Sequence, residues 1–386
     1  MAELFWIAHG TEVRHNANMS LYTRVIRPLL YRVPPDTIHP IVAGGSELVS
    51  RIPGVKNVLR AYFRVDEPPL AVTVNGIHFP NPVGLSAGFD KDGEFLHFEE
   101  VFGFGFAEIG SISRQPYVGN PKPWVRRMVR NKSLVVNYGL KSQGMDRVFD
   151  RMQNTHVQIP IGISLVKSNH PDCFGERAIA DYIAVYEKFA NVGDYYTLNL
   201  SCPNTPDGTP FTEPQALETL LTAIHAARQQ HGITKPTFLK INPDISNEHL
   251  AAIVALAIRY DMEGLVIGNL IKDKTKARAL LDFPEDHQPE WPGSLSGKPV
   301  RDLSTETIRQ AYQLANGKLT LIGTGGIFTG DHAYAKIRAG ASLVQLITGF
   351  IFGGPTTIRN INKRLLELLR RDGFRNISQA VGADHK

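Results

Sequence analysis

The chain has 386 residues, of which 42% are hydrophobic and 20% charged, and a formal net charge of +5 at pH 7. This globular composition excludes a disordered or fibrous protein, and no block of lysine and arginine with interleaved aromatics indicates a nucleic-acid partner. Two cysteines, Cys173 and Cys202, are too few for a disulfide framework and lack the paired spacing of a zinc site. We therefore expect a protein of a reducing compartment without a bound metal, whose positive charge suits an anionic ligand or a negative membrane surface.

Residues 1–20 form an amino-terminal extension whose order the sequence leaves open. An apolar patch from Leu4 to Ala8 follows Glu3 and is far shorter than the ~20 apolar residues of a membrane span. The extension is typical of neither a signal peptide nor a transmembrane helix.

Residues 21–65 carry apolar positions at helical spacing, such as Val25 and Leu29, among several arginines. After a pair of prolines, Asp36 is placed to cap a second helix, and a third helical piece, Ser46–Ile52, ends before a Pro-Gly pair. The pattern predicts a small amphipathic helical cap. Such a cap either covers the floor of the domain that follows, forms a dimer contact, or lies on a membrane.

Residues 66–386 alternate short β-rich apolar runs with amphipathic helices, which is typical of a parallel sheet. Eight runs are predicted as strands: Val83–Ala87, Phe106–Ile112, Ile161–Val166, Tyr195–Ser201, Thr237–Ile241, Leu265–Asn269, Leu319–Gly323 and Leu343–Ile347. Predicted helices include Pro214–Gln230, Ser246–Tyr260 and Thr357–Arg371. Eight such units predict an α/β fold of the (β/α)8 TIM-barrel type. Two long insertions, Arg114–Gly144 and Ile271–Leu303, follow the second and sixth strands, where barrel loops build active sites.

Glycine-rich segments follow the last two predicted strands, at Ile322–Ile327 and Thr348–Gly354. Glycines let backbone N–H groups approach a phosphate, and barrels often bind phosphate after strands seven and eight. The segments predict a phosphate-bearing cofactor or substrate, the alternative being glycines that only make tight turns.

Two lysines lie at predicted strand ends. Lys240 would point into the barrel mouth, where an ammonium group can face the N1–C2 edge of a flavin; otherwise it is a solvated lysine at the start of a loop. Lys91 lies beside a glycine turn, where it either clamps a substrate carboxylate or pairs with Asp90 or Asp92.

Cys202 directly follows the fourth predicted strand, between Asn199 and Asn204. A thiol has a reference pKa near 8.5, so a small fraction is thiolate at neutral pH and can remove a proton without a histidine partner. An isolated cysteine is more often a small buried hydrophobe, but the neighbouring asparagines favour a polar site. We predict that Cys202 is a catalytic base and that Cys173 is structural.

Four motifs resemble those of the dihydroorotate dehydrogenase family, and the resemblance covers residues 22–370. The motifs are Asn81–Gly93, Gly119–Pro123, Gly293–Gly297 and Ile322–Ile327. Chain length and the helical amino-terminal region are similar to those of the membrane-associated, quinone-using class 2 enzymes.

The resemblance implies non-covalent FMN and oxidation of (S)-dihydroorotate to orotate in pyrimidine biosynthesis. In that reaction a base removes the C5 proton, hydride passes from C6 to flavin N5, and the electrons leave to a quinone. The implied FMN contacts are Ala87, Gly88, Ser111, Ser164, Asn199, Lys240, Gly268, Gly297, Gly326, Ile347 and Thr348. The implied substrate contacts are Lys91, Val136, Asn137, Tyr138, Gly139, Leu140, Asn199, Asn204, Asn269 and Leu270. His39 and Arg127 fall at quinone-tunnel positions, and the implied location is peripheral, on the cytoplasmic side of the inner membrane.

The chain departs from the family pattern at four positions. Cys202 corresponds to the cysteine base of the soluble class 1 enzymes, whereas class 2 enzymes use serine at this position. Ser164 stands where the family usually has asparagine. Val136 takes the place of an asparagine that binds orotate, and Leu270 that of a threonine or serine. Asn137 compensates for Val136 only if its loop shifts.

Three hypotheses remain. The first is a quinone-linked dihydroorotate dehydrogenase. The second is an FMN oxidoreductase of the same fold that acts on a different cyclic amide or unsaturated ring, for which Val136 and Leu270 make the pocket more apolar. The third is a non-catalytic FMN-binding paralogue.

Overall fold

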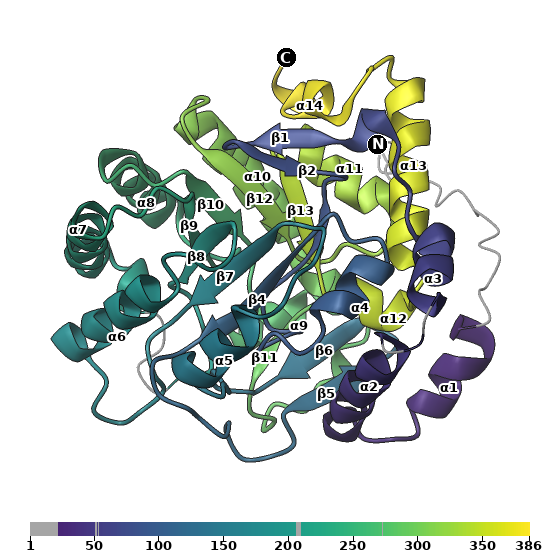
Figure 1. The fold of residues 1–386 in the computed structure, drawn as a ribbon, viewed down its shortest axis with the longest axis horizontal. Helices are drawn as coiled ribbons and strands as arrows, with labels where there is room; N and C mark the ends of the chain where they lie inside the picture. Colours follow the sequence, from purple (N-terminus) through teal and green to yellow (C-terminus); the bar gives the residue numbers. More distant parts are fainter. Residues whose placement is uncertain (1–21, 51, 53, 206–209, 272) are drawn as a thin grey trace, which may run out of the picture.

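The computed structural model describes residues 22–386 except 51, 53, 206–209 and 272, so the predicted extension of residues 1–20 lies outside the described residues. At its centre is a closed barrel of parallel strands in the order β10-β12-β13-β3-β4-β7-β8-β9 (Figure 1). The barrel strands are β3 Val83–Leu85, β4 Phe106–Ile112, β7 Ile161–Leu165, β8 Tyr195–Asn199, β9 Thr237–Ile241, β10 Gly264–Ile267, β12 Thr320–Thr324 and β13 Leu343–Leu346. Each predicted run overlaps one of these strands, and the predicted (β/α)8 barrel is confirmed.

Helices surround the barrel and bury the outer face of its strands, which is why the strands consist of continuous apolar runs. The helices after the first strand are α4 Leu96–Val101, α5 Met145–Met152, α6 Gly175–Lys188, α7 Pro214–Gln230, α8 Asn247–Arg259, α9 Lys274–Ala279, α10 Arg301–Ala315, α11 Gly330–Arg338, α12 Thr348–Gly353 and α13 Thr357–Arg371. Helices α7 and α13 have the predicted bounds. Helix α8 is one residue shorter at each end because Ser246 is its N-cap, and the Ser246 hydroxyl accepts the N–H of His249.

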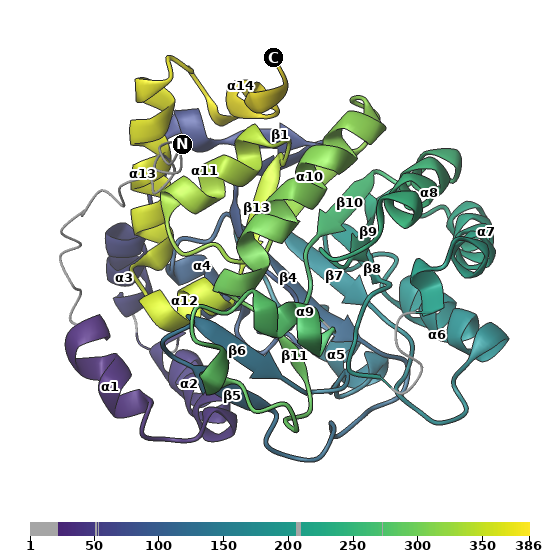
Figure 2. The same ribbon diagram turned by 180° about the vertical axis from the view of Figure 1, so that it is seen from behind.

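A two-stranded hairpin closes the floor of the barrel. Strands β1 (Val72–Val74) and β2 (Ile77–Phe79) are joined by Asn75 and Gly76, both at positive φ, as a two-residue hairpin turn requires. The Asn75 side chain accepts a hydrogen bond from Thr320 at the start of β12. The hairpin and α14 (Ile377–Ala380) lie at one end of the molecule, and α2 (Pro35–Ser50) lies toward the other (Figures 1 and 2).

The two long insertions meet in one small antiparallel sheet of order β11-β6-β5. The first insertion contributes β5 (Val125–Met128) and β6 (Ser133–Val136), and the second contributes β11 (Ser294–Leu295). Ser294 pairs with Val136, so the end of β6 is held beside the barrel mouth by β11, a segment much later in the sequence. Both insertions therefore help to build the region around the strand ends, as expected.

The predicted helical cap is present, but one of its helices differs from the prediction. A π-helical turn (Tyr22–Ile26) leads into α1 (Arg27–Leu30), followed by α2 (Pro35–Ser50) and α3 (Val55–Phe63). The separate helix predicted over Ser46–Ile52 is wrong, because α2 runs on to Ser50 and the next helix begins after Gly54, at a φ of +80°.

Asp36 was predicted to cap the second helix, and this is also wrong. It lies within the first turn of α2, and its carboxylate accepts the backbone N–H of Trp124 at 3.0 Å. This tertiary hydrogen bond, to the residue before β5, takes the place of the expected cap hydrogen bond within the helix.

The cap packs beside the barrel mouth rather than across the floor. Tyr22 and Arg27 donate to the carbonyl oxygens of Ile351 and Phe352 in α12. Lys56 and Arg60 of α3 form ion pairs of 3.2 and 3.0 Å with Glu100 of α4. Among the described residues, no helix is both long and apolar enough to cross a membrane.

Candidate active site

A cavity of about 300 Å³ opens at the carboxyl ends of the barrel strands and continues to the inner face of α2, where Pro35, Ile38 and Val42 line it. The site residues predicted from the sequence that line this cavity are Cys202, Arg127, Ala87, Gly88, Ser111, Asn199, Lys240, Gly268, Gly297, Gly326, Ile347, Thr348, Lys91, Val136, Tyr138, Gly139, Leu140, Asn204, Asn269 and Leu270. Strand-end positions in a barrel meet at one mouth, which explains why residues from Ala87 to Thr348 converge. Ser164 and Asn137 do not line the cavity, and the side chain of His39 lies outside the described part of the structure.

Backbone forms one wall of the cavity after β12 and β13. Gly325 and Gly326 both have positive φ, and a Cβ built on Gly326 would lie 2.3 Å from the Cβ of Arg301. A Cβ on Gly349 would lie 1.8 Å from the carbonyl oxygen of Ile327. Only glycine fits at these positions, so main-chain groups come directly to the cavity surface, which suits the phosphate of a bound cofactor.

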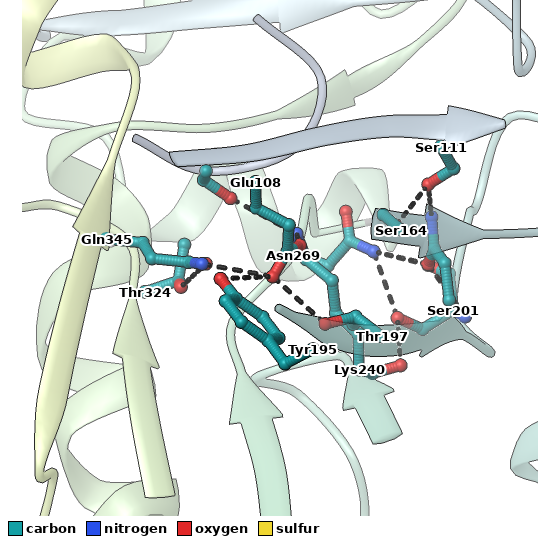
Figure 3. Close-up of polar contacts among 12 residues, drawn as sticks. Glu108, Ser111, Ser164, Tyr195, Thr197, Ser201, Lys240, Asn269, Thr324 and Gln345 are labelled. Carbon is teal, nitrogen blue, oxygen red and sulfur yellow. Dashed lines mark hydrogen bonds and ion pairs between the residues drawn. The ribbon is translucent and has the colours of Figure 1, made fainter. Parts of the chain in front are cut away.

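Asn199 is the hub of a polar chain that leads into the barrel. Its amide donates to the Ser111 hydroxyl at 2.7 Å, and Ser111 is within 2.8 Å of the Ser164 hydroxyl (Figure 3). Ser164 is fully buried behind Ser111 and does not line the cavity. It therefore supports a cavity residue instead of forming part of the cavity wall.

The amide of Asn269 is fixed by the barrel. It donates to the carbonyl oxygen of Ser201 at 3.0 Å and to the Ser201 hydroxyl at 2.9 Å, while its own oxygen accepts the N–H of Leu270. Ser201 in turn donates to the carbonyl oxygen of Lys240. This network locks the ends of β8, β9 and β10 together at Ser201, the residue before Cys202.

Lys240 reaches the cavity from β9, and its ammonium group is held from below. It donates to the Ser86 hydroxyl at 3.1 Å and forms a 3.4 Å ion pair with Glu108, whose side chain is completely buried (Figure 3). Lys240 therefore lies at the cavity, as the sequence predicted. Its partner Glu108 was not predicted, although one acidic residue inside the apolar run Phe106–Ile112 was a visible signal.

The two cysteines have different surroundings. Cys202 lines the cavity and is half-buried. Cys173 is buried away from the cavity, where its thiol contacts the Asp181 carboxylate and burial raises its pKa to about 11. A thiol with so high a pKa is a poor base at neutral pH, in agreement with the structural role predicted for Cys173.

Asn137 faces away from the cavity. Its side-chain oxygen accepts from Asn120 at 3.0 Å, on the side of the sheet where a second hollow lies. Asn204 lines the cavity, but its amide donates to the carbonyl oxygen of Val136 and its oxygen accepts from Ser294. In this structure Asn137 does not take the place of the asparagine that Val136 replaces, and the wall formed by Val136 and Leu270 is apolar.

The polar end of the cavity contains two lysines. Lys91 is buried, its ammonium lies 3.8 Å from the ring centroid of Tyr138, and it donates to the carbonyl oxygen of Gly88. Burial, with a smaller effect from Lys141, lowers the pKa of Lys91 to about 8. Lys141, which sequence analysis missed, also lines the cavity, and it lies 5.5 Å from the Trp124 ring. The pair makes this end suited to a carboxylate.

Arg127 lies where the cavity meets the cap. It donates to the carbonyl oxygens of Tyr31 and Val33 at 3.3 and 3.0 Å, and its guanidinium lies 4.5 Å from the Tyr31 ring. The His39 side chain lies outside the described part of the structure, although its neighbour Ile38 lines the cavity. Across the described residues, no group of three or more histidine, cysteine and acidic side chains could hold a metal ion.

The barrel and its mouth define an enzyme of the (β/α)8 class whose cavity has a glycine backbone wall, a buried lysine and a polar strand-end network. Comparison with known proteins narrows this class. Residues 69–369 match the dihydroorotate dehydrogenase family, and the chain belongs to this family of flavin-dependent enzymes.

Relatives of known name cover nearly the whole chain. The dihydroorotate dehydrogenase (quinone) of Nocardia farcinica is 35% identical over 366 residues, which are 95% of this chain and 98% of the relative. That of Rippkaea orientalis is 39% identical over 349 residues, 89% of each chain. The Eimeria tenella dihydroorotate dehydrogenase, solved in complex with ferulenol, superposes with a TM-score of 0.79 at 28% identity, covering 93% of this chain and 99% of that structure.

Proposed function

We propose that this enzyme binds FMN, oxidises (S)-dihydroorotate to orotate and passes the electrons to a quinone. One cavity joins Cys202 and Lys240 at the strand ends to Ile38 and Val42 of the cap, and this arrangement supports the proposal. One space thus offers a flavin site, a base and an apolar route outward.

The cofactor fits the residues at the mouth. Backbone at Gly326 and Gly349 would hold the FMN phosphate, and Lys240 would face the flavin ring. FMN supplies the acceptor for the two electrons and the hydrogen that leave the substrate.

The residues of the chain supply the remaining chemistry. Cys202 would take the proton from C5 of the dihydropyrimidine, and its position on the wall of the same cavity as Lys91 and Lys240 supports this role. Lys91 and Lys141 would hold the substrate carboxylate.

The cap would be the point of quinone entry and membrane contact. Most of the exposed large apolar side chains in the described residues lie on it: Val25, Ile26, Leu29, Ile41, Leu48, Ile52, Val58 and Tyr62. Together with the basic residues of the same helices, such a surface favours peripheral binding to an anionic bilayer, which in the cell would be the cytoplasmic side of the inner membrane.

Steady-state turnover of the FMN-loaded enzyme tests the acceptor. We expect orotate to form, measured by its near-ultraviolet absorbance, when dihydroorotate is supplied with a short-chain quinone, but not when the acceptor is NAD⁺ or fumarate. Turnover with fumarate or NAD⁺ and none with quinone would contradict the proposal.

A second candidate function is oxidation or reduction of a related cyclic amide or unsaturated ring. Val136 and Leu270 favour it, because an apolar wall replaces hydrogen-bonding groups, and loss of such a contact costs about 1–3 kcal/mol. Val136→Asn distinguishes the two functions. It should improve kcat/KM for dihydroorotate if that ring is the substrate, and it should leave dihydroorotate inactive if another ring is.

A further inference from the structure

Glu108 is a charged residue buried inside the barrel, on β4. Its side chain has no exposed surface, yet it is not on the cavity wall. One carboxylate oxygen pairs with Lys240 at 3.4 Å. The other accepts from Thr197 at 3.0 Å, Gln345 at 3.1 Å and Tyr195 at 3.5 Å (Figure 3).

The network ties together five barrel strands. Glu108 comes from β4, Thr197 and Tyr195 from β8, Lys240 from β9 and Gln345 from β13, and Thr324 of β12 donates to the Gln345 side chain at 3.2 Å. Both oxygens of the Glu108 carboxylate have partners. The opposite charge of Lys240 and these hydrogen bonds offset the large free-energy cost of burying the carboxylate.

The position of this pair next to the cavity gives it a functional consequence. A buried amine without a counter-charge favours its neutral form, because removal from water disfavours the charged one. When negative charge develops beside it, a protonated amine can balance that charge without taking up a proton, whereas a neutral amine must first be protonated.

We propose that Glu108 is a positioning residue that keeps Lys240 protonated before the flavin is reduced, so that two-electron reduction takes up one proton from solvent and not two. The inference rests on the flavin site of the proposed function. With FMN bound as proposed, reduction by two electrons would take one proton from solvent, and the Lys240 ammonium would already face the charge left on the ring. Without Glu108, Lys240 would take the second proton.

Of the other described side chains in contact with the pair, Tyr195 is the titratable one, and Ser86, Thr197 and Gln345 are neutral. Burial raises the pKa of Tyr195 well above its usual range, and the nearby Glu108 raises it further. Tyr195 therefore stays neutral over the range of the test.

The test measures the midpoint potential of the bound flavin between about pH 7.5 and 9, by equilibration with reference dyes, for purified FMN-loaded protein. The slope of the potential with pH gives the protons taken up per two electrons. We expect one for the native enzyme and two for Glu108→Gln. Thr197→Val is the matched control, because it removes a hydrogen bond to the same carboxylate and keeps both charges; we expect one.

A second variant checks the cause. Glu108→Gln combined with Lys240→Arg should return to one proton, since a guanidinium cannot release its proton in this range. A proton count of one in Glu108→Gln would overturn the proposal and leave Glu108 a purely structural residue. If Glu108→Gln does not fold, the native enzyme still decides, because a count of two above pH 7.5 would overturn the proposal. Absence of bound FMN in the native protein would instead contradict the proposed function.

Discussion

Cys202 and Cys173 form a natural pair for testing the base, because one lines the cavity and the other is buried against Asp181. Removal of a general base costs about 10²–10⁴ in rate. We predict that Cys202→Ala slows anaerobic flavin reduction by dihydroorotate by about that factor, whereas Cys173→Ala leaves the rate nearly unchanged. Equal rates in the native enzyme and Cys202→Ala would remove Cys202 from the chemistry and favour a non-catalytic FMN-binding protein.

The two lysines at the polar end make a prediction about pH. Burial first, and Lys141 second, lower the pKa of Lys91 to about 8, so its ammonium form is present below pH 8 and is lost above it. We therefore expect kcat/KM for the anionic substrate to fall as pH rises through about 8. Lys141→Gln should move this fall to higher pH and raise KM several-fold, because a nearby positive charge is removed.

Lys122 is the control for Lys141. Both ammonium groups lie near the Trp124 ring, at 4.6 and 5.5 Å, but Lys122 is exposed and does not line the cavity. Lys122→Gln should leave KM and the pH profile as they are. If both variants changed KM and the pH profile in the same way, the effect would come from the overall positive charge of the surface and not from Lys141 in the cavity.

Side-chain direction is the part of the site that the sequence did not determine. Cys202, Lys240 and Asn199 were predicted at the cavity because a barrel sends every strand end to the same mouth. The direction of Asn137 depends on where β6 ends and on its pairing with β11, from a segment about 160 residues later. No local pattern of residues carries that information.

At the level of elements, periodicity predicted α7 and α13 to the residue because a long amphipathic helix has many positions in agreement. It failed in the cap, where α2 continues past the predicted start of a third helix and ends at Ser50. Apolar positions at helical spacing run through the cap, but their periodicity alone does not mark where one helix ends and the next begins.

The exposed apolar residues of the cap predict membrane binding. Leu48 and Val58 are 64% and 70% exposed on α2 and α3. The double variant Leu48→Asp/Val58→Asp should lower binding to anionic liposomes by tenfold or more, since each buried side chain contributes about 1.5–3 kcal/mol. Flavin reduction by dihydroorotate should not change.

Leu314 provides the comparison for the cap residues. It is 45% exposed on α10, a helix of the barrel wall far from the cap in sequence. Leu314→Asp should leave liposome binding at the native level, measured by cosedimentation. Loss of binding in this variant, or its retention in the double variant, would show that the cap is not the membrane surface.

On the scale of the whole molecule, one buried acid should limit stability. Glu99 of α4 is fully buried, and neither of its oxygens has a hydrogen-bond partner in the described structure. Burial, with a smaller effect from Asp90, raises its pKa well above the usual range. The unfolded chain ionises at lower pH than the folded one, so this residue reduces stability as pH rises above about 4.

We predict that Glu99→Gln raises the free energy of unfolding by about 1–3 kcal/mol at pH 8 and by less at pH 5. The adjacent Glu100→Gln should act in the opposite direction, because it removes the ion pairs with Lys56 and Arg60. Denaturant unfolding at both pH values measures these changes. A loss of stability in Glu99→Gln at pH 8 would show that the carboxylate is stabilised by contacts in the folded state.

An anaerobic stopped-flow experiment, run without any acceptor, tests the claim that dihydroorotate is oxidised in this cavity. FMN-loaded enzyme mixed with dihydroorotate should lose its flavin absorbance in a single turnover and form one orotate per flavin. An unchanged flavin band at millimolar dihydroorotate, in protein that retains its FMN, would contradict the claim.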